Sequence, residues 1–172
     1  GIGFAIAQGL IAEGARRVYI TGRSAATLEA AVAKLGDRAV AVISDVARQA
    51  DLDKLKATIE ARNDQVDSVF ANAGICEKNP LGETTEAAYF NLFDINVKGV
   101  FFTVQTLMPL LKNGASIVLT ASICSSNGME GLSLYNASKT AVRSFARTWA
   151  NELKGRKIRT NVLSPGFTRT PL

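Results

Sequence analysis

The sequence predicts an α/β fold in which a parallel sheet is covered by helices on both faces. Short apolar segments alternate along the chain with longer segments of helical periodicity, which is the order of elements that builds a parallel sheet. The short segments are apolar on both faces, as strands between two layers of helices must be. Polar or glycine-rich clusters follow directly after them, at the sheet edge where open α/β folds bind ligands.

The expected elements follow from this alternation. Strands are expected over residues 17–21, 39–43, 66–71, 116–120 and 158–163. The first helix opens at Gly1-Ile2-Gly3 and ends at Gly14, and further helices are expected over residues 24–35, 52–61, 84–111 and 135–153. The chain fits a single domain, residues 1–172. Because such a sheet should begin with a strand and continue past the last one here, we expect the domain to be truncated at both ends.

The composition, 47% hydrophobic and 20% charged, is ordinary for a soluble globular protein. The net charge of +5 is scattered along the chain, which argues against nucleic acid as a partner. No apolar run reaches the roughly 20 residues that a membrane span needs. Cys76 and Cys124 lack metal-type spacing, so free thiols in a cytoplasmic protein are the simplest account. Since histidine is absent, acid–base chemistry falls to Tyr, Lys, Asp or Glu, and no metal site is expected.

Ser122, Tyr135 and Lys139 are the catalytic candidates. Tyr135 and Lys139 are four residues apart in a helical segment, so their side chains share one helix face. A free phenol ionises near pH ~10, and a neighbouring ammonium favours the phenolate and lowers that pKa. A tyrosine tuned in this way can exchange a proton with a carbonyl or alcohol oxygen. Taken alone, this spacing more often reflects an aromatic rim residue beside a solvated lysine, so the case for catalysis depends on the other motifs of the chain.

Residues near the start of the chain suggest a dinucleotide. The helix that opens at Gly1-Ile2-Gly3 has free backbone N–H groups that can hold a pyrophosphate, although glycines are also common in ordinary turns. The next strand ends in residues 21–24 with Arg23 and no carboxylate. An acid at this place binds the 2′-hydroxyl of NAD, whereas an arginine accommodates the 2′-phosphate of NADP. Arg23 therefore favours NADP(H), with NAD(H) as the second choice; a plain surface arginine is the alternative.

Further candidates lie after later strands and inside a helix. Asp45 is expected to accept from an adenine amino group while Val46 packs on the ring, or else to cap its own turn. Asn72-Ala73-Gly74 is either a small turn that lets a cofactor approach closely or a plain tight turn. Asn96 lies inside the helix expected over residues 84–111, where asparagine weakens a helix, so we expect a polar role or a kink.

Together these motifs resemble the short-chain dehydrogenase/reductase family over nearly the whole chain. The matching motifs are Tyr135-x-x-x-Lys139, Ser122 thirteen positions before the tyrosine, Asn96, Asn72-Ala73-Gly74, Asp45-Val46 and Pro165-Gly166-Phe167-Thr168-Arg169-Thr170. Within the family, the chain is most similar to the oxoacyl-reductase and sugar-dehydrogenase-like branches. The resemblance implies a Rossmann-type doubly wound sheet.

The resemblance also implies an NAD(P)(H)-dependent oxidoreductase that interconverts a ketone and a secondary alcohol by hydride transfer. Tyr135 would be the general acid/base, while Lys139 would lower its pKa and hold the nicotinamide ribose. Ser122 would bind the substrate oxygen, and Asn96 would position a water in a proton relay. The cofactor would be bound by Gly1, Ile2, Gly3, Arg23, Asp45, Val46, Asn72, Ala73, Gly74, Tyr135, Lys139, Pro165, Gly166, Thr168 and Thr170.

The chain departs from the family pattern in three places. The first strand and the opening of the glycine motif are not in the sequence, Ala71 replaces a second asparagine, and the variable segment after residue 170 is not included. The first departure motivates a rival hypothesis, a catalytically inactive dinucleotide-binding or scaffold fragment of a longer family member. The complete set of Ser122, Tyr135 and Lys139 argues against this rival. As partners we expect a small carbonyl or alcohol substrate and further copies of the chain, in a homodimer or homotetramer.

Overall fold

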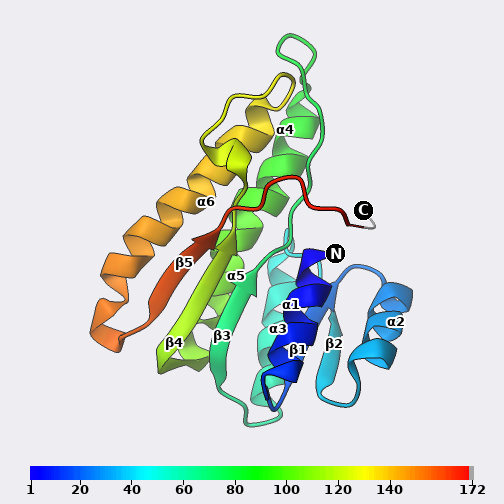
Figure 1. The fold of residues 1–172 in the computed structure, drawn as a ribbon, viewed down its shortest axis with the longest axis vertical. Helices are drawn as coiled ribbons and strands as arrows, with labels where there is room; N and C mark the ends of the chain where they lie inside the picture. The colour runs from blue at the N-terminus through cyan, green and yellow to red at the C-terminus, as the bar shows by residue number, and fades with distance from the viewer. Residues whose placement is uncertain (171–172) are drawn as a thin grey trace.

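Residues 1–170, which the computed structural model describes, adopt the predicted α/β architecture (Figure 1). The strands are β1 (Val18–Gly22), β2 (Ala39–Ile43), β3 (Val66–Ala71), β4 (Leu111–Thr120) and β5 (Arg159–Leu163). The helices are α1 (Ile2–Ala12), α2 (Ala25–Leu35), α3 (Gln49–Glu60), α4 (Glu86–Phe93), α5 (Gly99–Leu107) and α6 (Ser133–Glu152). Every strand pair in this part of the chain is parallel, which confirms the predicted fold class.

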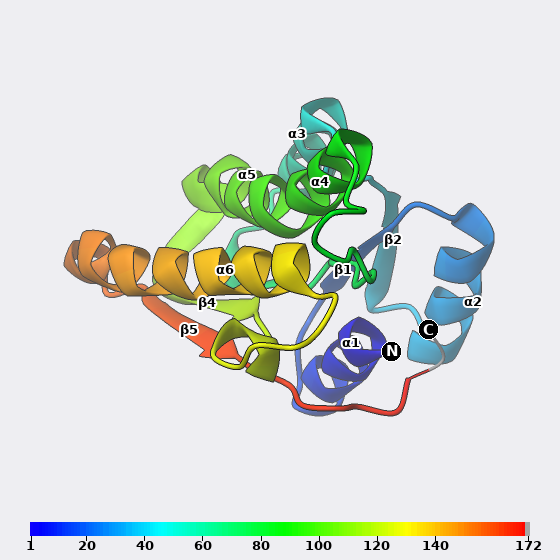
Figure 2. The same ribbon diagram turned by 90° about the horizontal axis from the view of Figure 1, so that it is seen from above.

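Helices lie on both sides of the strands. Seen from above, α3, α4, α5 and α6 lie on one side of β4 and β5, and α1 lies on the other side (Figure 2). The second helix, α2, packs against β2. Among the described residues, none of the helices combines the length and the apolar character needed to cross a membrane.

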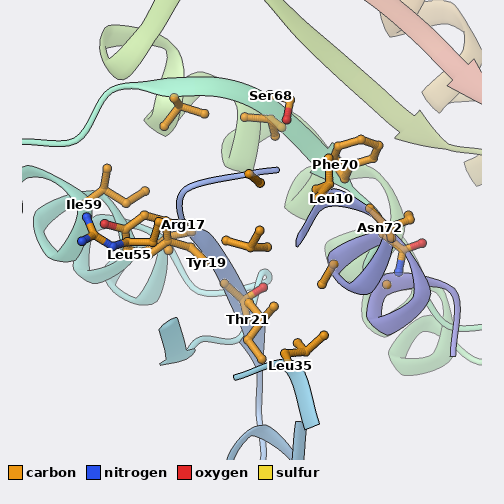
Figure 3. A pocket seen from close by; sticks show the side chains of 18 of the residues that line it. Leu10, Arg17, Tyr19, Thr21, Leu35, Leu55, Ile59, Ser68, Phe70 and Asn72 are labelled. Atoms are coloured by element: carbon orange, nitrogen blue, oxygen red, sulfur yellow. The ribbon is translucent and has the colours of Figure 1, made fainter. Parts of the chain in front are cut away.

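The strands form two sheets instead of one continuous sheet. One sheet has the order β1–β2, and the other has the order β3–β4–β5. Within the described residues, β1 and β3 do not pair with each other. Residues of both strands line a cleft of about 480 Å³ that separates them (Figure 3). Parallel register still brings the carboxyl ends of all strands to one edge of the molecule (Figure 1).

Local sequence signals set several helix boundaries as expected. Ser24 caps the start of α2, where its Oγ accepts a hydrogen bond from the Thr27 backbone N–H at 3.3 Å. Gly14, just past α1, has a φ of +95°, a conformation that glycine adopts without the steric cost that other residues meet.

The segment expected to be one helix over residues 84–111 is divided. The helix α4 ends at Phe93, a π-helical turn covers Asp94–Lys98, and α5 continues from Gly99. A 3₁₀ turn with Pro109 follows α5, and Leu111 already belongs to β4. The single helix was therefore wrong in its interior and at its end, because Asn96 is held by contacts outside its own helix and proline lacks the N–H that a helix needs.

The main core joins α5 and α6 to the three-stranded sheet. Ile117 and Leu119 of β4 and Val142 of α6 are completely buried in it. The rings of Phe145 and Trp149 stack at a centroid distance of 5.3 Å beside these residues. This packing fixes the start of α6 above the carboxyl end of β4.

A charged cluster closes the opposite end of the molecule, where β1 and β3 begin. Asp64 accepts hydrogen bonds from Tyr19 at 2.7 Å, from Arg16 at 2.6 Å and from Arg17. These bonds lower the pKa of Asp64 from 3.8 to about 2, and the bond from Tyr19 has the largest effect. Burial of the carboxyl group acts in the opposite direction but is outweighed. The cluster therefore ties the β1–β2 sheet to the residue just before β3.

Asp64→Asn should lower the melting temperature at neutral pH and make the melting temperature depend less on pH between 2 and 4. Because the pKa of Asp64 is lower in the folded chain than in the unfolded one, its stabilisation is present above about pH 4 and is lost as the pH falls toward 2. Melting temperatures measured between pH 2 and pH 7 check this. Asp67→Asn is the matched control, since Asp67 is mostly exposed and pairs only at the surface, with Lys112 at 2.7 Å. Equal pH profiles for both variants would contradict the role given to Asp64.

Candidate active site

The predicted catalytic residues come together at the carboxyl edge of β4. Ser122 lies just past β4, and Tyr135 and Lys139 lie in the first turns of α6. The Lys139 ammonium is buried and lies 5.7 Å from the centre of the Tyr135 ring. Its Nζ donates a hydrogen bond to the backbone carbonyl of Thr120, the last residue of β4, at 2.9 Å.

The pKa values around Tyr135 differ from the expectation. Burial raises the pKa of the Tyr135 phenol, and the hydrogen bond with Ser122 opposes that rise only in part. Burial also lowers the pKa of the Lys139 ammonium to about 8. The expected lowering of the tyrosine pKa by Lys139 is therefore not found, because the ammonium lies over the ring and is bonded to the Thr120 carbonyl.

Ser122 is held by the short 3₁₀ helix that follows it, residues Ile123–Ser125. Its Oγ accepts a hydrogen bond from the backbone N–H of Cys124 at 3.2 Å, and the side chain is buried. The same hydroxyl interacts with the Tyr135 phenol. The hydroxyl groups of Ser122 and Tyr135 therefore lie close together at the end of β4.

Asn96 lies at the centre of the π-helical turn and is completely buried. Its Oδ1 accepts from the Ile75 backbone N–H at 2.8 Å, and its Nδ2 donates to the Ile75 carbonyl at 2.9 Å. Nδ2 also donates to Ser138 Oγ at 3.1 Å, and Ser138 donates in turn to the Tyr135 carbonyl at 2.7 Å. A chain of hydrogen bonds thus connects the loop after β3 to the helix that carries Tyr135.

Thr120, Ser138 and the backbone of Ile75 belong to this site but were not expected. Thr120 acts through its carbonyl, and its Oγ1 also donates to Asn72 Oδ1 at 3.1 Å. A backbone contact leaves no mark on residue type, so Thr120 and Ile75 carried no signal. Ser138 carried one weak signal, a small hydroxyl residue directly beside Lys139 on a buried helix face.

Gly1, Ile2 and Gly3 begin α1 at the same edge as the catalytic residues. The first turn of α1 has neither a side-chain cap nor an acidic residue, so its free N–H groups suit an anion. Gly3 is close to the loop after β3, because a Cβ there would lie 3.1 Å from Asn72 Nδ2. Thr170 is close to Gly1, because a Cβ added at Gly1 would lie 3.9 Å from the Cβ of Thr170.

The other cofactor candidates lie along the same edge. Arg23 is exposed just past β1. Asp45 Oδ1 accepts from the Ala47 backbone N–H at 3.0 Å, so its carboxylate caps the turn, which was the alternative kept open. Val46 packs against Gly99 at the start of α5, where a Cβ would lie 2.8 Å from its Cγ2.

The segment Pro165–Thr170, drawn in red, runs from the end of β5 toward the start of α1 (Figure 1). The Pro165 carbonyl accepts from the Ile123 backbone N–H at 3.1 Å, which fixes the segment beside Ser122. Gly166 lies next to Ile123, and Thr168 is exposed and bonds back to the Gly166 carbonyl at 3.2 Å. The structure thus places these residues between the catalytic group and the α1 N-terminus.

The turn Asn72-Ala73-Gly74 is small for a reason that the sequence did not reveal. A Cβ at Gly74 would lie 3.0 Å from Lys139 Nζ and 3.2 Å from Asn96 Oδ1. Both groups are held by other hydrogen bonds and are buried. Glycine at this position therefore leaves room for the two buried polar groups that flank Tyr135.

Two kinds of comparison link the chain to known proteins. The family model described as short chain dehydrogenase matches residues 1–172. An oxidoreductase of Sarocladium schorii, asL5, is 44% identical over 100% of this chain and 70% of its own length. An NADP-dependent (R)-specific alcohol dehydrogenase of Lentilactobacillus kefiri is 38% identical over 100% of this chain and 71% of its own length.

Solved structures agree with this assignment. A dehydrogenase/reductase from Sinorhizobium meliloti is 33% identical, with a TM-score of 0.93 over 99% of this chain and 69% of that chain. A short-chain dehydrogenase from Streptomyces avermitilis is 32% identical, with a TM-score of 0.92 over 100% of this chain and 64% of that chain. Both solved structures therefore share the fold of this chain over nearly its whole length.

Gly74→Ala should destabilise the chain by about 1–3 kcal/mol, because the added methyl group crowds two buried groups that cannot move without losing hydrogen bonds. Urea unfolding measures the effect. Gly128→Ala is the control, since a Cβ at Gly128 meets nothing within 4 Å. A Gly74→Ala variant as stable as the control would mean that Lys139 and Asn96 shift freely.

Proposed function

The chain belongs to the short-chain dehydrogenase/reductase family of oxidoreductases, and on this premise we propose that it interconverts a ketone and a secondary alcohol with NAD(P)(H). The observation that carries the proposal is the convergence of Ser122, Tyr135 and Lys139 at the end of β4. A hydroxyl pair beside a buried ammonium can bind a carbonyl oxygen and exchange a proton with it.

Tyr135 is the proposed general acid in the reducing direction and the general base in reverse. The phenol is protonated at neutral pH and so carries the proton that a reduced carbonyl oxygen needs, although burial, which raises its pKa, makes it hold that proton more firmly. Ser122 interacts with the phenol and would hold the same substrate oxygen. The Lys139 ammonium, with a pKa of about 8, would stabilise negative charge that develops at the phenol.

Asn96 is proposed to support the proton relay mainly by holding the π-helical turn in place. Its Nδ2 hydrogens are bonded to Ile75 and Ser138, and its Oδ1 already accepts from Ile75. A water bound at Asn96 would have to use the remaining lone pair of Oδ1 or the backbone carbonyl of the π-helical turn. The side-chain amide would then act mainly by fixing the turn beside Lys139.

The residues at the carboxyl edge fit a dinucleotide. The uncapped start of α1 suits the pyrophosphate, and Asp45 and Val46 lie at the end of β2, where the adenine would be bound. Lys139 and Thr170 are proposed to meet the nicotinamide ribose and the phosphates. When bound, the nicotinamide supplies or accepts the hydride, while the protein supplies position and charge.

We propose NADP(H) as the preferred cofactor and NAD(H) as the weaker one. The end of β1 holds the exposed Arg23 and no carboxylate, which favours a 2′-phosphate. The Lentilactobacillus kefiri relative is described as NADP-dependent, which supports the same choice. We further propose a small-molecule substrate, a cytoplasmic location and a homodimer or homotetramer; the exposed Tyr89 and Phe90 of α4 would suit a contact between copies.

Tyr135→Phe should lower turnover by about 100-fold or more and leave NADPH affinity nearly unchanged, because it removes the proton and keeps the ring. Steady-state reduction of a panel of ketones and fluorescence titration with NADPH measure the two effects. Tyr89→Phe, which removes an exposed phenol on α4, is the control. Full activity in Tyr135→Phe would refute the assignment. Cofactor binding by the parent chain without turnover of any substrate would favour the inactive dinucleotide-binding protein.

Arg23→Ala should weaken NADPH binding by roughly tenfold or more and change NADH binding little, because a charge-assisted bond to the 2′-phosphate is lost. Separate titrations of the 172-residue chain with the two nucleotides test this. Arg147→Ala, an exposed position far along α6, controls for the loss of one positive charge. Equal losses for both nucleotides would contradict the 2′-phosphate site.

A further inference from the structure

Tyr135 lies in a helix turn that has no side-chain cap. In the described part of the chain, Leu132, the residue before α6, makes no side-chain hydrogen bond to the first turn, and that turn contains no acidic residue. Tyr135 is the third residue of α6, which covers Ser133–Glu152. Helix ends leave backbone N–H groups without partners and fray more readily than helix interiors. The position of the phenol then depends on contacts that reach the first turn from other elements.

Ser138 provides such a contact. It lies one turn after Tyr135 and is completely buried although it is polar, so its hydroxyl group needs hydrogen-bond partners. The Ser138 Oγ donates to the Tyr135 carbonyl at 2.7 Å and accepts from Asn96 Nδ2 at 3.1 Å. Asn96 lies outside α6, in the π-helical turn that packs against it. One hydroxyl group therefore joins the backbone of Tyr135 to a different element of the fold.

The direction of every hydrogen bond in this chain is fixed. The Ile75 backbone N–H can only donate, so Asn96 has to present its Oδ1 to it, at 2.8 Å. Asn96 Nδ2 therefore faces the Ile75 carbonyl and Ser138. The Ser138 Oγ accepts an amide hydrogen, and its single hydroxyl hydrogen goes to the Tyr135 carbonyl. Neither the amide nor the hydroxyl group can turn without leaving a buried polar group unpaired.

We propose that Ser138 is a positioning residue for Tyr135, whose phenol it holds within reach of Ser122 through its bond to the Tyr135 carbonyl. This inference rests on the proposed reaction and gives Ser138 a role in it. Ser138 does not touch the substrate, because it is completely buried. A helix serine that bonds back to an earlier carbonyl has a local effect on its helix. Here the same hydroxyl group also accepts from Asn96, so it carries the position of the π-helical turn to the tyrosine.

The contact that depends on this positioning is the hydrogen bond between Ser122 and Tyr135. Burial has the larger effect on the pKa of Tyr135 and raises it, whereas the bond with Ser122 lowers it. Ser122 cannot follow a displaced phenol, because its Oγ accepts from the Cys124 backbone N–H at 3.2 Å and its side chain is buried. Removal of the Ser138 hydroxyl group should therefore weaken this bond and raise the pKa of Tyr135 further.

Three other titratable groups face the phenol from the elements packed around it. Lys139, on the same helix, lies 5.7 Å from the centre of the Tyr135 ring. Charges on Cys76, after β3, and on Cys124, after β4, add to the rise of the Tyr135 pKa that burial causes. Within residues 1–170, no side-chain hydrogen bond joins Ser138 to any of the three. The loss of its hydroxyl group therefore acts on the pKa through the position of the phenol.

The test compares the parent chain with the variants Ser138→Ala and Ser44→Ala. Ser138→Ala removes the hydroxyl group without adding volume. Ser44→Ala is the matched control, because Ser44 is also buried and its Oγ has no hydrogen-bond partner among the described residues. Melting temperatures show whether each variant is folded before the two readouts are compared.

The first readout is the NMR signal of the Tyr135 phenol and does not depend on turnover. The chain has three tyrosines, so a ¹³C label at Cζ gives three signals, and Tyr135→Phe identifies that of Tyr135. Ser138→Ala should shift the Tyr135 signal at neutral pH and leave that of the exposed Tyr89 in place. Ser44→Ala should leave both in place. A Tyr135 signal that is the same in Ser138→Ala and in the parent chain overturns the proposal.

The second readout is turnover. Ser138→Ala should lower kcat by about 10- to 100-fold, because a small displacement of a reacting group is costly, and should leave the KM for NADPH nearly unchanged. In the direction of alcohol oxidation, Tyr135 has to accept a proton, so the rise of activity with pH should move to higher pH. A lower melting temperature with unchanged kcat and pH profile would show a purely structural role and overturn the proposal.

Two further variants test the hydroxyl group and the chain of bonds. Ser138→Thr keeps a hydroxyl group that can reach an earlier carbonyl in a helix, and it should restore most of kcat. A Ser138→Thr variant that melts like the parent chain and still behaves like Ser138→Ala would refute the role of the hydroxyl group. Asn96→Ala combined with Ser138→Ala should be no slower than Asn96→Ala alone, because the two residues act in series. Additive losses would contradict the link through Asn96.

Failure of this inference can be distinguished from failure of the proposed reaction. A parent chain that turns over no ketone or alcohol refutes the reaction, and the NMR comparison still decides whether Ser138 positions Tyr135. An active parent chain whose Ser138→Ala variant keeps the parent kcat and the parent Tyr135 signal refutes the positioning role alone.

Discussion

The buried ammonium of Lys139 is the constraint on which the rest of the site depends. It is held by the carbonyl that ends β4, so the position of the sheet edge sets the position of the charge. Burying a cation is costly without a partner, and the room for it is provided by Gly74, where a side chain would collide. Asn96 borders the same space and is bonded to the next turn of α6 through Ser138. The π-helical turn, the small loop after β3 and the start of α6 therefore form one arrangement around a single charge.

The same burial gives the two titrating groups opposite shifts. The pKa of Tyr135 rises and that of Lys139 falls, because both charged forms lose hydration. Each shift favours the uncharged form of its group, so the phenol holds its proton more firmly and the ammonium loses its proton more readily, near pH 8. The interaction between Ser122 and Tyr135 acts against the burial effect and is the contact that favours the phenolate. The pKa shifts of Tyr135 and Lys139 therefore come more from burial than from pairing with an opposite charge.

The sequence predicted the fold class and which side chains meet, but not how they are held. The bounds of β2 and β3 were predicted to the residue, because each is an unbroken apolar run between turn residues. The segment over residues 84–111 was predicted as one helix because its apolar period continues through Asn96, and the bonds of Asn96 to the loop after β3 are tertiary contacts that the period does not reveal. Backbone groups of Thr120 and Ile75 have no residue-type signature. The direction of the Tyr135 pKa also could not be predicted, because spacing along a helix says nothing about how deeply the phenol is buried.

The residues proposed for cofactor choice and for proton transfer lie on different elements of the fold. The residue proposed to discriminate between nucleotides, Arg23, follows β1, whereas the groups proposed to handle the proton follow β4 or lie on α6. No hydrogen bond of the described residues joins Arg23 to Ser122, Tyr135 or Lys139. The two proposed roles can therefore be tested by separate mutations. A lineage could exchange one nucleotide for the other, and an engineer could do the same, without rebuilding the catalytic group.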